Sequence, residues 1–120
     1  MAIRVALIED NDVYRHALEL LLTLGGEIEI VASESDGERI VERCLELSPD
    51  VLLVDYRLPG LDGVQVTRLV RERCPNVAVV ALTAAAEARE REALIEAGAS
   101  ACIGKDESLD RIVEAVREAA

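Results

Sequence analysis

The order of apolar and polar residues limits the folds open to this chain more than any other feature. Short apolar runs alternate with longer segments in which apolar residues recur every three or four positions. The first pattern is typical of buried strands and the second of amphipathic helices. Residues 51–54, Val-Leu-Leu-Val, form the clearest run, as expected for a strand buried on both faces. The other expected strands are residues 3–8, 28–32, 77–82 and 101–103.

Capping and helix-breaking residues bound the segments between these strands. Asp36 and Ser108 are suited to cap helix N-termini, because their side-chain oxygens can accept hydrogen bonds from free backbone N–H groups. Pro49 stops one helix, and Gly98 suits a C-terminal cap. The expected helices are residues 13–24, 36–47, 62–73, 87–97 and 108–119.

Two of these helices carry specific expectations for burial. In the first, the apolar residues at helical spacing are predicted to face the core; they are Val13, Ala17, Leu20, Leu21 and Leu24. In the fourth, Leu94 and Ile95 are predicted to point inward. The residues of that helix expected largely on its solvated side are Glu87, Arg89, Glu90, Arg91 and Glu92.

The alternation predicts an α/β fold: a doubly wound, five-stranded parallel sheet with five helices joined by short loops. The length of 120 residues suits one domain, residues 1–120, with a core of its own. Because the chain has no Phe or Trp and only two Tyr, that core must be built from branched aliphatic residues and alanine.

Polar residues follow four of the five expected strands. Glu9 and Asp10 follow the first, Asp55 the third, Thr83 the fourth and Lys105 the fifth. Lys105 is the only lysine, since the other twelve of the 13 basic residues are arginines. Ligands of open parallel sheets bind outside the carboxyl ends of the strands. These side chains are therefore predicted to converge in one pocket.

The predicted pocket has the groups that phosphoryl chemistry needs. Three clustered carboxylates repel one another, and a divalent cation such as Mg²⁺ removes that cost. A lysine and a hydroxyl can hold the remaining phosphoryl oxygens, and a central Asp55 is the natural nucleophile. Glu9 and Asp10 also have a plainer interpretation, because an acidic pair before Asn11-Asp12 is often a helix N-cap.

Over nearly its whole length the sequence resembles the receiver domain of bacterial two-component response regulators. The matching elements are Glu9-Asp10, the segment Asp55-Tyr56-Arg57-Leu58-Pro59-Gly60-Leu61-Asp62-Gly63, Thr83-Ala84, and Lys105 after Gly98-Ala99-Ser100-Ala101. The resemblance implies a flavodoxin-like topology. It also implies a signalling switch in which a sensor histidine kinase passes the phosphoryl group of its phosphohistidine to Asp55.

The same resemblance implies a role for each matched residue. Mg²⁺ would be held by Glu9, Asp10, Asp55 and the backbone carbonyl of Arg57. Thr83 and Lys105 would contact the phosphoryl oxygens, and an inward move of Thr83 would be the switch.

Two positions depart from the family's usual pattern. Cys102 stands three residues before the lysine, where the family commonly has an aromatic ring that turns inward on activation. Only the threonine-linked part of the switch is therefore expected. Asp106 follows the lysine where proline is frequent. The Lys-Asp pair before a capping serine resembles the same segment of regulators that have a C-terminal helix-turn-helix. This resemblance implies that a DNA-binding output domain outside this chain controls transcription. It also implies a homodimer on activation.

Two other function classes compete with the phosphorylation switch. One is a non-phosphorylated interaction module on the same fold, suggested by Cys102. The other is a phosphatase of the haloacid-dehalogenase type, which also forms an aspartyl phosphate. That class needs a carboxylate two residues after its nucleophile, where this chain has Arg57, and its nucleophile follows the first strand. The chain is thus not expected to be an enzyme beyond its own phosphorylation and dephosphorylation.

Charge and composition exclude further classes. A net charge of −11 disfavours binding of this chain to nucleic acid or anionic lipid. No apolar stretch is of membrane-spanning length and no leader is evident, so a soluble cytoplasmic protein is expected. The three cysteines have no paired spacing and are expected to act as small hydrophobic residues in a reducing compartment.

Overall fold

A computed structural model describes residues 2–58, 60–84 and 88–120 of the chain. It contains one parallel sheet with the strand order β2-β1-β3-β4-β5, which confirms the predicted doubly wound, flavodoxin-like fold. The strands are β1 (Ile3–Ile8), β2 (Ile28–Glu34), β3 (Val51–Asp55), β4 (Ala78–Thr83) and β5 (Ala101–Gly104). The helices are α1 (Asp12–Thr23), α2 (Gly37–Leu47), α3 (Gly63–Arg73), α4 (Ala88–Ala97) and α5 (Leu109–Ala119). None of these described helices is long and apolar enough to cross a membrane.

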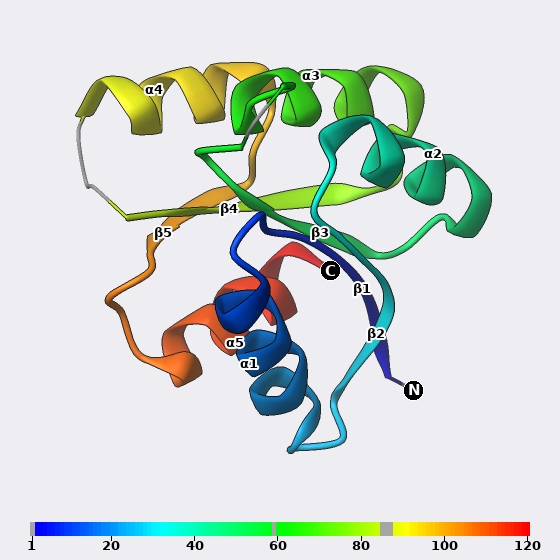
Figure 1. Cartoon of the computed structure of the whole chain (residues 1–120), viewed down its shortest axis with the longest axis vertical. Coiled ribbons are helices and arrows are strands. Elements are labelled where there is room, and N and C mark those ends of the chain that lie inside the picture. The colour runs from blue at the N-terminus through cyan, green and yellow to red at the C-terminus, as the bar shows by residue number, and fades with distance from the viewer. Residues whose placement is uncertain (1, 59, 85–87) are drawn as a thin grey trace.

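Helices cover both faces of the sheet, with α2, α3 and α4 on one side and α1 and α5 on the other (Figure 1). Successive residues of a strand point to opposite faces. Ala6 and Ile8 accordingly belong to the core beneath the first group of helices, whereas Val5 and Leu7 belong to the core beneath α1 and α5. Both faces of β3 and β4 are buried, so these strands are apolar up to their last residues, Asp55 and Thr83.

The topology fixes where a ligand can bind. β1 pairs with β2 on one side and with β3 on the other, so the order of the strands reverses at β1. Ligand sites of such sheets lie at the carboxyl ends of the strands that flank this reversal. Here those ends carry Glu9, Asp10 and Asp55.

Local capping explains where the helices begin. Asn11 caps α1 by accepting a hydrogen bond from the backbone N–H of Tyr14, at 3.0 Å. Asp36, Asp62 and Ser108 cap α2, α3 and α5 in the same way. Since Asn11 performs this task in α1, the interpretation of Glu9 and Asp10 as the helix cap is wrong.

The predicted inner face of α1 is also wrong. Leu18 and Leu22 are buried against the sheet, whereas Val13, Leu20 and Leu24 are 81%, 70% and 74% exposed. Ala17 is exposed, and Leu21 is 43% exposed. The helix is rich in leucine on several sides, so two stripes satisfy helical spacing. Packing against β2 and α5 selects the stripe that contains Leu18 and Leu22.

The prediction for α4 is partly wrong. Leu94 is buried as expected, but Ile95 is 50% exposed. Glu90, predicted on the solvated side, is only 7% exposed and shares the inner stripe with Leu94 and Ala97. Glu87 lies outside the described residues. A carboxylate thus points into the protein from the first turn of this helix.

Candidate functional site

Backbone pairing sets the predicted site residues side by side at one edge of the sheet. Asp55 pairs with Leu82, and the N–H of the next residue, Tyr56, donates to the carbonyl of Leu82 at 3.0 Å. On the other side of β4, the N–H of Lys105 donates to the carbonyl of Thr83 at 2.8 Å. The register of three neighbouring strands therefore places Asp55, Thr83 and Lys105 at the same level.

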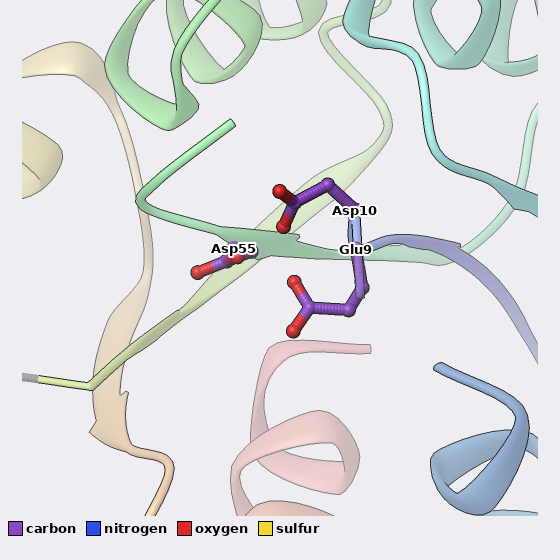
Figure 2. Close-up of side chains that lie close together, drawn as sticks. All are labelled: Glu9, Asp10 and Asp55. Atoms are coloured by element: carbon purple, nitrogen blue, oxygen red, sulfur yellow. The ribbon is translucent and has the colours of Figure 1, made fainter. Parts of the chain in front are cut away.

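Glu9, Asp10 and Asp55 form an acidic cluster at this edge. Each offers one carboxylate oxygen, and these oxygens lie within 4.8 Å of one another. Figure 2 shows Glu9 and Asp10 at the end of β1, with their carboxylates turned toward the side on which Asp55 lies. Glu9 and Asp55 are 1% and 4% exposed, whereas Asp10 is open to solvent.

The acidic cluster fits a hard divalent cation. The Oε2 atom of Glu9 is buried and has no hydrogen-bond partner among the described residues. An orphaned buried carboxylate oxygen is costly unless it is protonated or bound to a cation. Mg²⁺ prefers one or two carboxylates together with water and phosphate oxygens, and the exposed side of Asp10 leaves room for these.

Lys105 supplies the positive charge of the site. Its Nζ lies 2.5 Å from Glu9 Oε1, 3.3 Å from Asp55 Oδ2 and 4.7 Å from the centre of the Tyr14 ring. Burial lowers the pKa of Lys105, but the hydrogen bond to Glu9 and the charges of Asp55 and Glu9 outweigh this and raise it above its ordinary value. The only lysine of the chain therefore remains charged between two carboxylates.

Within the pocket, the protonation of Glu9 is shifted by its surroundings. Burial is the main cause that raises the pKa of Glu9 from 4.5 to about 7, with hydrogen bonding to Asp55 and its charge adding to the rise. Lys105 opposes the shift without cancelling it. Near neutral pH, the metal-free pocket thus holds Glu9 only partly ionised.

A Glu9→Gln variant should be more thermally stable than the unmodified chain without metal, by an amount that depends on pH. The raised pKa means that the folded state favours protonated Glu9, which Gln imitates. The advantage should be small below pH 4.5, grow as the pH rises to about 7, and then level off. Melting temperatures of both proteins in EDTA from pH 4 to 8 measure this difference in stability. Glu29→Gln, at an exposed position, is the control. A pH-independent difference would contradict the assignment.

The hydroxyl of Thr83 is engaged by α4. Thr83 is 1% exposed, and its Oγ1 donates to Glu90 Oε2 at 3.1 Å. The other oxygen of Glu90 lies 3.5 Å from the guanidinium of Arg57. The structure therefore brings Thr83 to the edge of the site, with a hydrogen bond directed to the helix.

The pocket itself has a volume of about 390 Å³. Its lining consists of Glu9, Asp10, Asn11, Tyr14, Asp55, Arg57, Ala84 and Lys105. The backbone N–H of Arg57 donates to Asp55 Oδ1 at 3.3 Å, while its side chain is 68% exposed. All four predicted charged groups at the strand ends thus meet in one open pocket, with Arg57 at its rim.

Sequence reasoning missed two residues near the site. Tyr14 is not among the predicted site residues, yet its ring lies beside the ammonium of Lys105. Glu90 was placed among solvated charges. Its spacing of four residues from Leu94 and seven from Ala97, both buried, is the signal that could have placed it on the inner stripe.

Comparison with known proteins shows the family of the chain. The family model for the response regulator receiver domain matches residues 5–117. The transcriptional regulatory protein LnrK of Bacillus subtilis is 36% identical over 95% of this chain and 52% of its own length. The chain thus spans about half the length of the curated relatives it matches.

Solved structures of response regulators have the same fold as this chain. The signal receiver domain of the response regulator NarL from Mycobacterium tuberculosis superposes with a TM-score of 0.93 at 32% identity, covering 98% of this chain and 94% of that one. A DNA-binding response regulator of the LuxR family from Staphylococcus aureus gives a TM-score of 0.91 at 25% identity, covering 98% of each chain. With the family model matched along nearly the whole sequence, the chain belongs to the response regulator receiver domains.

Proposed function

We propose that residues 1–120 form one receiver domain in which Asp55 accepts a phosphoryl group from a sensor histidine kinase in the presence of Mg²⁺. The observation that carries this proposal is the setting of Asp55. Its carboxylate is buried at the end of β3, 3.3 Å from the ammonium of Lys105 and within the acidic cluster. A nucleophile, a cation and a candidate metal site therefore coincide.

Each group has a defined part in the transfer. A carboxylate oxygen of Asp55 attacks the phosphorus, a new O–P bond forms, and the P–N bond to the donor histidine breaks, so that the imidazole leaves with the bonding electrons. Lys105 is placed to neutralise charge on the phosphoryl oxygens. Glu9, Asp10, Asp55 and the backbone carbonyl of Arg57 would hold Mg²⁺, which when bound neutralises charge on the transferring group.

The output is proposed from the relatives. LnrK is a transcriptional regulatory protein about twice as long as the segment it shares with this chain. We infer that the phosphorylated receiver acts on a DNA-binding output domain outside this chain, in the cytoplasm, and that it forms a homodimer when active. The receiver's own chemistry is then limited to its phosphorylation and dephosphorylation.

Acetyl phosphate with Mg²⁺ should load one phosphoryl group onto the chain, and EDTA should prevent it. Intact-mass spectrometry measures the adduct. Hydroxylamine should remove it, because an acyl phosphate is cleaved by this nucleophile and a phosphoserine is not. Absence of the adduct at saturating donor and Mg²⁺ would favour the alternative function, a non-phosphorylated interaction module.

A further inference from the structure

Glu90 is a buried carboxylate whose two oxygens contact Thr83 and Arg57, two residues beside the pocket. Its side chain is 8% exposed on the first turn of α4. Oε2 accepts from the hydroxyl of Thr83 at 3.1 Å, and Oε1 lies 3.5 Å from the guanidinium of Arg57. Both partners belong to the end of the sheet that carries Asp55.

We propose that Glu90 is a positioning residue that holds the Thr83 hydroxyl toward α4 in the unphosphorylated chain. The hydrogen bond between Thr83 and Glu90 breaks when Asp55 is phosphorylated. The inference rests on the proposed function of Asp55. In this proposal Glu90 competes with the phosphoryl group for the hydroxyl of Thr83. The affinity of the site for a phosphoryl group therefore depends on a residue outside the pocket lining.

The competition follows from the chemistry of a hydroxyl group. Thr83 has one hydroxyl proton, so it cannot make a full hydrogen bond to Glu90 and to a phosphoryl oxygen at the same time. Both acceptors are anionic, and hydrogen bonds to charged groups are the strong ones. Phosphorylation therefore replaces one strong bond of Thr83 with another, and the free energy of the switch is the difference between them.

Arg57 provides a second, weaker link to Glu90. Its backbone N–H donates to Asp55, so the residue adjoins the phosphoacceptor, and its guanidinium reaches the helix. Because the side chain is 68% exposed, this ion pair contributes little by itself. New negative charge on Asp55 would attract the guanidinium in the same direction as the threonine, away from Glu90.

Release of Glu90 would act on the start of α4. The next residue, Arg91, donates to the carbonyl of Cys102 in β5 at 2.9 Å. Glu90 and Arg91 thus fasten the first turn of α4 to two strands. After loss of Thr83, the carboxylate still benefits from the positive end of the helix dipole, which lowers the cost of release. This route does not require an aromatic residue at position 102.

The experiment measures the dissociation constant of the phosphoryl mimic beryllofluoride with Mg²⁺ for a set of variants. Glu90→Ala should bind about tenfold more tightly than the unmodified chain, because the anionic acceptor Glu90 no longer competes for the Thr83 hydroxyl. Glu92→Ala, an exposed position on the same helix, should leave binding unchanged. Thr83→Ala should weaken binding, and adding Glu90→Ala to it should change binding less than about twofold.

Each outcome decides between the proposals. If the unmodified chain does not bind beryllofluoride, the proposed function of Asp55 fails, and the role of Glu90 fails with it. If the unmodified chain binds but Glu90→Ala behaves like Glu92→Ala, only the role of Glu90 is overturned. A tenfold gain that persists with Thr83→Ala would also overturn it, because the effect would not pass through the threonine.

A merely structural role for Glu90 gives a different pattern. Destabilising α4 would alter binding equally with and without Thr83. If Glu90→Ala does not fold, Glu90→Gln replaces it, since its amide oxygen keeps the shape of the contact while the charge is lost. This variant should bind two- to fourfold more tightly, again only when Thr83 is present. Unchanged affinity would overturn the proposal.

Discussion

An Asp55→Asn variant should take up no phosphoryl group under conditions that load the unmodified chain. The amide has nearly the shape of the carboxylate, but it lacks the anionic oxygen that attacks phosphorus. Asp55 is 4% exposed and fixed in strand register with Leu82, so the variant keeps its amide at this place. Intact-mass spectrometry after incubation with acetyl phosphate and Mg²⁺ measures the loss.

Two further variants make the Asp55 result specific. Asp110→Asn changes an exposed aspartate at the start of α5 by the same chemistry and should load fully. Asp10→Asn removes an acid from the acidic cluster but keeps the acceptor, so it should load more slowly and require more Mg²⁺. An adduct of unchanged yield on Asp55→Asn would show that another residue is the phosphoacceptor.

Gly63→Ala should destabilise the fold by about 1–3 kcal/mol or more. A Cβ at Gly63 would lie 2.5 Å from the carbonyl oxygen of Asp55 and 2.7 Å from the Cα of Tyr56. Both are backbone atoms, so the clash cannot be relieved by rotating a side chain. Either α3 or the strand end that carries Asp55 must move. Urea denaturation should show the loss, and the melting temperature should fall by roughly 10 °C.

The control for Gly63 is Gly25→Ala. No atom lies within 4 Å of a Cβ added at Gly25, so the stability should change little. If Gly63→Ala were as stable as Gly25→Ala, the close contact between the start of α3 and residues 55–56 would be wrong. Loading of Asp55 in the folded fraction of Gly63→Ala should also decrease, since the clash acts on the carbonyl of Asp55 itself.

The fold was predictable because its signals are local and repeated. Residues 51–54 are apolar at every position, and only a strand covered on both faces needs such a run. The site was predictable for a geometric reason. In a parallel sheet all carboxyl ends lie on one edge, so Asp55 and Lys105 are brought together by the topology, although 50 residues separate them.

What sequence could not supply is the choice between competing faces and partners. In α1, the spacing of Val13, Leu20 and Leu24 is as regular as that of Leu18 and Leu22, and only the position of the sheet and α5 decides which stripe is buried. Glu90 is a charged residue that is buried, because its carboxylate accepts a hydrogen bond from the hydroxyl of Thr83, which belongs to a different element. The spacing of Glu90 to Leu94 indicates its burial, but the identity of its partner depends on a tertiary contact that no local pattern contains.

The hydrogen bonds that join the ends of β3, β4 and β5 determine where motion can occur after phosphorylation. The N–H groups of Tyr56 and Lys105 are both engaged in this ladder, so they should exchange with solvent deuterium only when the sheet itself opens. The backbone next to Asp55 is therefore held by hydrogen bonds to the neighbouring strand. Under the proposed function, a response to phosphorylation would pass through rotating side chains and a shifting helix on a timescale of microseconds to milliseconds, while the strands keep their register.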